Sequence, residues 1–379
     1  MNRVMITLNN HYNPPIVFHP GETLSEKLEE LGMGPKEFAI RTGKPEKTIF
    51  AILGGKSSIT PEMAVQFEHV LRIPAHYWLN MQRHYDEFLA RQKRVALLPE
   101  AVAWASNFPV LEMMKKGWMP LQKTQEARAS ELLMFFGFSL HTAWEDYYLK
   151  QQLKLAFRIS LRHTKQPYAI SAWLRRGELQ AAALPRVAYD EQAFKAVLPE
   201  IKNLMVHQPT GFFSQLQEIC LDAGVKVIHT PSLQKAPISG CTRWLQDVPL
   251  IQLTGRYKRN DSFWFTFFHE VGHILLHGKK EVFLENIEYE EADQQKEKEA
   301  EANQFAVKWT FSEKEQRLLK DQITEETVQA LAREIHTHPA MIIGRLQYQK
   351  KVPYTFGRRF IEPISLEGRR CVRWLLRSR

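Results

Sequence analysis

Two histidines four positions apart are the residues in this chain of 379 best suited to chemistry. They stand in the segment FWFTFFHEVGHILLHG as His269-Glu270-x-x-His273. A helix brings positions i and i+4 onto one face, one turn apart, so both imidazoles can bind one metal ion. Zinc suits such ligands and, in catalytic sites, keeps one position open for water. Glu270 follows the first ligand and is the predicted general base.

A third protein ligand is expected from the acidic segment EKEAEANQFAVKW further along the chain. We prefer Glu299, because Asn303 lies four residues later and can support a ligating histidine by a hydrogen bond. Glu301 is the alternative ligand. His277 is interpreted as a structural residue, since Gly278 directly after it indicates a helix end.

The elements that must position these residues can be read from the apolar patterns. The runs VKVIHT, SGCTRWL and PLIQLT are short, partly alternating and bounded by Gly, Pro or Asp, which predicts three strands before the histidine helix. Residues 96–205 are helical in pattern and rich in large apolar groups. We identify no chemistry there and interpret this stretch as a helical connecting region.

The histidine segment also supports a family resemblance. FHEVGHILLHG, preceded by LTGRYKRNDSFWFTF and followed by EAEANQFA, resembles the ImmA/IrrE metallopeptidases over residues 206–350. The resemblance implies a zincin-like domain in which His269, His273 and Glu299 bind Zn²⁺ and Glu270 is the catalytic base. It further implies an endopeptidase that cleaves a protein partner such as a transcriptional repressor. His338 and Arg345 are candidates for stabilising the developing oxyanion, although a helix cap or a salt bridge explains either residue as well.

The stretch from Gly21 to Arg94 reads as five short helices separated by glycine or proline. Its second and third helices, in GPKEFAIRTGKPEKTIFAILGGKSS, have the lengths and the Gly43 turn of a helix-turn-helix. Five basic and two acidic residues lie between Gly34 and Ser58, and the alternative interpretation is a solvated charged face. Lys47 and Thr48, near the start of the third helix, are predicted to reach base edges, and Lys56 and Ser57 beyond it are better placed for phosphates. Lys36 and Lys44 complete the set of predicted DNA contacts.

A second resemblance covers this N-terminal region. HPGETLSEKLEELG, AILGGKSSITPEMA and IPAHYWLNMQRHYDE resemble the HigA group of antitoxins within the Xre-type helix-turn-helix repressors, over residues 15–95. The resemblance implies a domain that forms a homodimer and binds double-stranded operator DNA. A toxin partner is the alternative to a protein substrate.

Composition limits the remaining possibilities. The formal charge is +9, and residues 351–379 supply +6 of it, as a basic tail that is either solvated or in contact with phosphates. Three widely spaced cysteines indicate neither a disulfide framework nor a cysteine zinc site. The first residues do not resemble a signal peptide, and no apolar run is long enough to cross a membrane. We therefore expect a cytoplasmic protein without membrane contact.

These observations predict a mainly α fold with a small β-sheet, an α+β protein. Its expected parts are a five-helix helix-turn-helix domain (15–95), a helical connecting region (96–205), a zincin-like metallopeptidase domain (206–350) and a basic tail (351–379). The predicted function is a DNA-binding transcriptional regulator whose zinc-dependent endopeptidase domain cleaves a protein partner. The alternative is an antitoxin-like operator-binding repressor of a toxin-antitoxin module, whose metal domain is sensory or structural.

Overall fold

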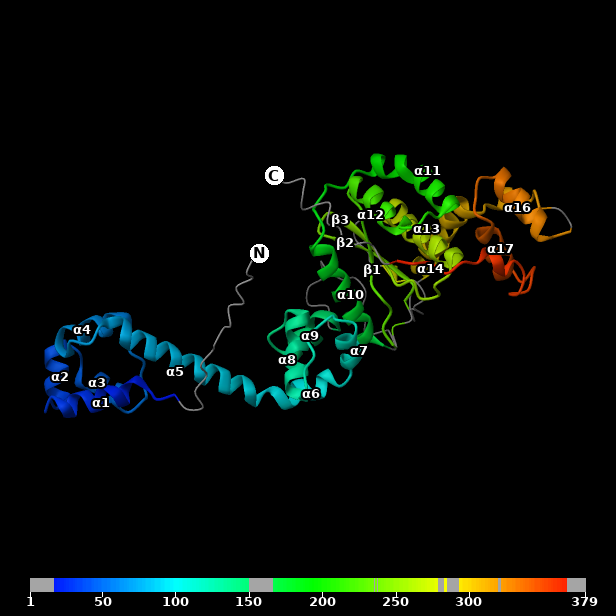
Figure 1. The fold of residues 1–379 in the computed structure, drawn as a ribbon. Helices are drawn as coiled ribbons and strands as arrows, with labels where there is room; N and C mark the ends of the chain where they lie inside the picture. Colours follow the sequence, from blue (N-terminus) through cyan, green and yellow to red (C-terminus); the bar gives the residue numbers. More distant parts are fainter. Residues whose placement is uncertain are drawn as a thin grey trace, which may run out of the picture. The chain divides into compact units, whose positions relative to one another are not determined.

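The computed structural model describes residues 17–149, 166–234, 236, 238–278, 283–284, 293–319 and 322–366. The chain divides into two compact units, residues 1–99 and 100–379. Figure 1 shows the helices of the first unit in blue. They are α1 (Pro20–Glu30), α2 (Pro35–Thr42), α3 (Glu46–Leu53), α4 (Pro61–Leu71) and α5 (Ala75–Ala96).

Local signals set the boundaries of these helices. Prolines occupy the first turn of α1, α2 and α4, where a missing N–H costs nothing. Gly43 ends α2 with a φ of 63°, which favours glycine. The Thr60 hydroxyl caps α4 by accepting a hydrogen bond from the Met63 amide at 3.3 Å. The five predicted helices are confirmed, and their shared core includes Leu24, Phe38, Ile49, Phe67 and Trp78.

The rest of the chain is also mainly helical. Its helices are α6 (Leu98–Ala105), α7 (Val110–Lys115), α8 (Gln125–Phe136), α9 (His141–Tyr148), α10 (Pro167–Ala182), α11 (Glu191–His207), α12 (Phe212–Asp222), α13 (Asn260–His277), α14 (Asp293–Thr310), α15 (Glu313–Gln316), α16 (Glu325–Glu334), α17 (Pro339–Tyr348) and the 3₁₀ turn η2 (Arg358–Phe360). Its strands are β1 (Lys226–His229), β2 (Gly240–Leu245), β3 (Val248–Leu253) and β4 (Phe283–Leu284). No helix in the described ranges is both long and apolar enough to span a bilayer.

The four strands form one small sheet in the order β1-β3-β2-β4. β1 and β3 are parallel, whereas β2 is antiparallel to both β3 and β4. The expected α+β class and the three predicted strands are therefore confirmed. Sequence reasoning missed β4, because a two-residue strand carries no periodic signal.

The sheet has a helix layer on each face, and alternation along β3 separates the two. Ile251 and Leu253 belong to the core that α12 and α13 form on one face. Leu250 and Gln252 point to the other face, where Leu250 packs with Ala181 of α10. This alternation is the period-2 geometry of a strand buried on both sides.

Buried hydrogen bonds join α10 to the sheet. Arg243 of β2 is 1% exposed, and its Nη1 lies 3.0 Å from Glu178 Oε1. Its Nη2 donates to the Leu174 carbonyl at 2.5 Å. The Gln252 amide donates to the Trp173 carbonyl at 2.8 Å. A buried charge is tolerated only with such partners, so this network fixes α10 against one face of the sheet.

The helices α6 to α10 share an aromatic core with the segment that leads into β2. Trp104, Phe108, Phe136 and Trp144 are in mutual ring contact, edge-to-face in every pair except Phe108–Phe136, which is tilted. Three residues of the segment before β2 belong to the same core, namely Leu233, Ala236 and Ile238. Residues from the predicted connecting region therefore help to position the start of β2.

We predict that Glu178→Ala destabilises the second unit by about 3 kcal/mol, because it leaves the buried Arg243 guanidinium without its carboxylate. Urea unfolding followed by circular dichroism measures the change. Glu191→Ala is the matched control, since it breaks the exposed Lys195–Glu191 pair at a cost of about 0.3–0.5 kcal/mol. Equal changes in the free energy of unfolding for the two substitutions would show that the buried Arg243 pair stabilises the fold no more than an exposed ion pair does.

Candidate metal centre

Helix α13 carries the two histidines on one buried face. His269 and His273 are each 1% exposed, and Glu270 between them is fully buried. The helix begins after Arg259 with Asp261 in its first turn, where a negative charge is favourable, and it ends at Gly278. As the sequence spacing predicts, one helical turn brings the two imidazoles together, with ring centroids 4.6 Å apart.

The partner helix α14 packs unusually close to α13 at Gly272. A Cβ atom at this position would lie 3.1 Å from both Ala302 Cα and Phe305 Cβ, closer than side chains normally approach. Two small residues at the crossing therefore let the two backbones meet. This close approach brings Glu299, near the start of α14, next to the paired histidines.

Three ligand atoms converge at this crossing. His269 Nε2 and His273 Nε2 are 3.0 Å apart, and the Glu299 carboxylate lies 3.2 Å from the first and 3.6 Å from the second. Ligands about 2.0–2.1 Å from a tetrahedral zinc ion are roughly 3.3 Å from one another. The three residues therefore have the donor types and the spacing that such an ion requires.

The outer ring atoms of both histidines have partners. His269 Nδ1 lies 3.1 Å from Asn303 Oδ1, the contact that the sequence predicts for Asn303. With that oxygen accepting the Nδ1 proton, the Nε2 lone pair of His269 faces the Glu299 carboxylate, an arrangement that a cation between them makes favourable.

His277, which the sequence analysis interprets as a structural residue, contacts one of the two paired histidines. It is the last residue of α13, as expected from Gly278, but its Nδ1 lies 3.0 Å from His273 Nδ1. Its Nε2 lies 2.9 Å from Glu301 Oε2. Glu301, the alternative third ligand, thus contacts His277 and not the group of His269, His273 and Glu299. His277 in turn contacts His273, so these contacts connect Glu301 to one of the candidate ligands.

The surroundings favour the protonation states that bind metal. Burial lowers the pKa of His273 to about 4, against the opposing hydrogen bond with Glu299. Burial acts to raise the pKa of Glu299, but hydrogen bonds with His269 and His273 outweigh it and bring the pKa to about 2. At neutral pH His273 is therefore neutral and Glu299 is ionised.

A glycine makes room for Glu270. Gly240 is the first residue of β2, and a Cβ atom there would lie 2.4 Å from Glu270 Oε1 and 2.7 Å from Thr266 Cγ2. The Thr242 hydroxyl donates to the Glu270 carbonyl at 3.0 Å, which ties β2 to α13. Sequence analysis missed both β2 residues, because nothing in the segment SGCTRWL indicates which strand end meets the helix.

A cleft of about 500 Å³ opens beside the three converging residues and is lined by His269, Glu299 and Asn303. Arg345 of α17 also lines it. His338 does not: it is the N-cap of α17, with Nδ1 accepting a hydrogen bond from the Ala340 amide at 3.2 Å. Of the two candidates for oxyanion stabilisation, only Arg345 therefore lines the described cleft.

The predicted DNA contacts lie in the first unit around the α2–α3 turn. Lys36, Lys47 and Lys56 are exposed, and Thr48 is half-buried. Lys44 is different, because its Nζ lies 2.7 Å from Glu62 Oε1 and its side chain is 15% exposed. Within this group Lys44 is therefore the least accessible to a phosphate.

Only part of the basic tail is described. Arg359 of η2 lies 2.7 Å from Glu325 of α16, so this basic residue is held by an ion pair. The segment RRCVRWLLRSR, on which the prediction of phosphate contacts also depends, lies outside the described residues.

Comparison with known proteins finds matches for two parts of the chain. The IrrE N-terminal-like domain model of the peptidase M78 family matches residues 220–339. The uncharacterized HTH-type transcriptional regulator YddM of Escherichia coli K12 is 36% identical over 67 residues, which cover 18% of this chain and 71% of that protein.

Solved structures similar to the chain include two antitoxins. An addiction module antidote protein of the HigA family from Coxiella burnetii is 32% identical, with 22% of this chain and 91% of that chain covered and a TM-score of 0.21. The Pseudomonas aeruginosa antitoxin HigA, solved with the higBA promoter, is 26% identical, with 21% and 89% covered and a TM-score of 0.21. By its N-terminal domain the chain therefore belongs to the HTH-type transcriptional regulators, and its residues 220–339 match the IrrE N-terminal-like domain of the peptidase M78 family.

Proposed function

We propose that the second unit is a zinc-dependent endopeptidase that cleaves a protein partner. The observation that carries the proposal is the convergence of His269 Nε2, His273 Nε2 and the Glu299 carboxylate at distances of 3.0–3.6 Å. The match to a peptidase family supports it independently. In this proposal the three residues hold Zn²⁺, and Asn303 orients His269.

The chemistry divides between the ion and the chain. Zinc bound by these residues supplies Lewis acidity toward a peptide carbonyl and toward water. Glu270 takes a proton from the attacking water as its oxygen bonds to the carbonyl carbon, and it returns a proton to the leaving nitrogen as the C–N bond breaks. Burial of Glu270 beneath Gly240 holds its carboxylate in one place for both transfers.

We predict that Glu270→Gln abolishes cleavage while zinc binding persists, because the substitution removes the base and keeps the ligands. Zinc-loaded protein is incubated with candidate partner proteins and the products are identified by mass spectrometry. The matched control is Glu297→Gln, on the exposed part of α14. Failure to obtain any Glu270-dependent product from any partner would remove the endopeptidase proposal.

The Glu301–His277 pair generates a separate prediction about metal affinity. We expect His277→Ala to weaken zinc binding about 10-fold to 100-fold, because His273 loses the partner of its outer nitrogen. Competition with a zinc-binding dye measures the affinity without any substrate. His207→Ala serves as the control, because Nδ1 of this exposed histidine bonds its own helix backbone, at the Asn203 carbonyl. An unchanged affinity in His277→Ala would mean that the pair does not support the ligand.

For the first unit we propose binding of double-stranded operator DNA as a homodimer, with α3 in the major groove. The relation to HTH-type regulators and the exposure of Lys36, Lys47 and Lys56 support this role. The whole chain would then be a regulator whose output is proteolysis. In the alternative, an antitoxin-like repressor, the metal domain senses or stabilises, and Glu270→Gln would leave operator repression and toxin neutralisation intact.

We expect Lys47→Ala to weaken binding to a DNA fragment from the gene's own upstream region. The slope of log Kd against log salt concentration should fall by about one, because one cationic contact to the DNA is lost. Lys44→Ala should change binding much less, because Glu62 already neutralises that ammonium group. Fluorescence anisotropy at several salt concentrations measures both variants. Equal losses in the two would show that α3 is not the element that enters the groove.

A further inference from the structure

The cleft beside the converging histidines has a cation without a partner in the described structure. We propose that this cleft binds an acidic side chain of the substrate peptide and that Arg345 is the residue that selects it. The inference deepens the proposed endopeptidase function and rests on it. It names the substrate class: a peptide segment with Asp or Glu close to the bond that is cleaved.

Arg345 extends from α17 into the lining of the cleft. Its Nε is buried and has no hydrogen-bond partner among the described residues. A buried donor without an acceptor is costly, and a guanidinium fits a carboxylate by two parallel hydrogen bonds. The unmet donor is therefore one that a carboxylate of a bound peptide could satisfy.

The carboxylates that line the described cleft are already engaged. Glu299 contacts the two histidines. Asp261 receives two hydrogen bonds from Arg259, at 2.9 and 2.7 Å. Arg259 also donates to Gln347 at 3.0 Å. The charges of Arg259 and Asp261 thus offset each other, whereas the positive charge of Arg345 remains available to a ligand.

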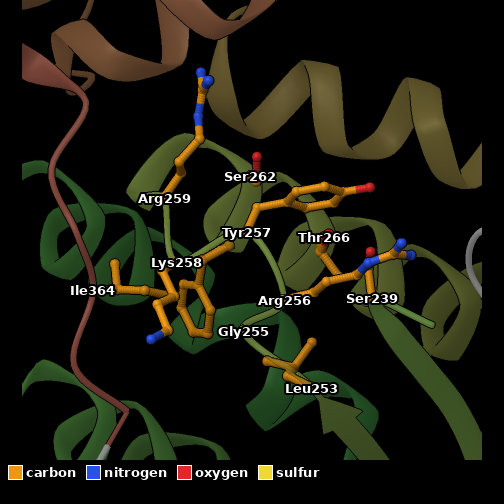
Figure 2. Close-up of a pocket in the computed structure, with 11 residues that line it drawn as sticks. Ser239, Leu253, Gly255, Arg256, Tyr257, Lys258, Arg259, Ser262, Thr266 and Ile364 are labelled. Carbon is orange, nitrogen blue, oxygen red and sulfur yellow. The ribbon is translucent and has the colours of Figure 1, made fainter. Parts of the chain in front are cut away.

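A second cation lies at the rim. A second pocket shares Ser239, Tyr257, Ser262 and Thr266 with the cleft and continues along α13. Figure 2 shows Arg256 extending past Thr266 toward Ser239, on the side that the two pockets share. The Arg256 guanidinium lies 5.4 Å from the centre of the Tyr257 ring. Arg256 is exposed and can add long-range attraction for an acidic peptide.

The charge balance of the site supports the same ligand. With one divalent cation bound, Glu270 and Glu299 are offset by the ion, and Arg259 offsets Asp261. Arg345 then gives the cleft a net positive charge, and Arg256 in the adjoining pocket adds to it. A positive cleft with partly apolar walls, including Phe265 and Met341, favours a peptide that combines an acidic residue with apolar neighbours.

Cleavage of a synthetic peptide library tests the inference. The zinc-loaded protein should cut peptides with Asp or Glu at one fixed position from the cleaved bond, and Arg345→Glu should shift that preference to Lys or Arg. Arg333→Glu, an exposed charge reversal on α16, should keep the original preference. Glu270-dependent cleavage without an acidic preference would overturn the inference while leaving the endopeptidase proposal standing. If Arg345→Glu and Arg345→Lys lower kcat equally for all peptides, Arg345 acts on the oxyanion instead and the inference fails.

A binding experiment needs no turnover and separates the two proposals further. Zinc-loaded Glu270→Gln protein is titrated into the same fluorescent library and into a copy in which Asn and Gln replace Asp and Glu. The acidic library should bind about ten-fold more tightly, and a second substitution, Arg345→Glu, should remove the difference. Equal affinities for the two libraries would overturn the inference, whatever the wild-type protein cleaves.

Discussion

The close crossing of α13 and α14 is the constraint on which the candidate metal centre depends. Two of its three candidate ligands come from one turn of α13, but the third comes from α14 and can join them only if the two backbones nearly touch. Gly272 and Ala302 permit that contact, since a Cβ atom on Gly272 would already lie 3.1 Å from the Ala302 backbone. A second close approach, between Gly240 and Glu270, positions the carboxylate opposite β2. Small residues at two packing contacts thus set the geometry that the polar residues use.

The helices upstream of the sheet form part of the same scaffold. Their sequence suggested only a connecting region, because apolar periodicity does not reveal what a helix packs against. In the structure, α10 is held to the sheet by the buried contacts of Arg243 and Gln252. The aromatic core of α6 to α10 also takes in Leu233 and Ile238, directly before the strand whose first residue faces Glu270. Packing in this region therefore extends to Glu270, the proposed general base, through one short segment of backbone.

Sequence reasoning succeeded where the relevant interactions are local. The spacing of His269 and His273 is a property of one helix, and the five N-terminal helices are marked by their own prolines and glycines. It was incomplete where the partner lies far along the chain. The contact of His277 with Glu301 and the ion pair of Lys44 with Glu62 depend on how the helices pack, which the periodicity of a single helix does not encode. The preference for Glu299 over Glu301 came from its four-residue spacing to Asn303. That spacing is a local property of α14, although the histidine that both residues contact belongs to α13.

The central claim is that one ion is bound by two imidazoles and one carboxylate at the α13–α14 crossing. X-ray absorption spectroscopy of the purified full chain at the zinc edge tests it most directly. The account predicts one zinc per chain, with two imidazole nitrogens among nitrogen and oxygen ligands at about 2.0–2.1 Å. The absence of a stoichiometric ion, or a coordination sphere that contains sulfur or lacks histidine scattering, would contradict it.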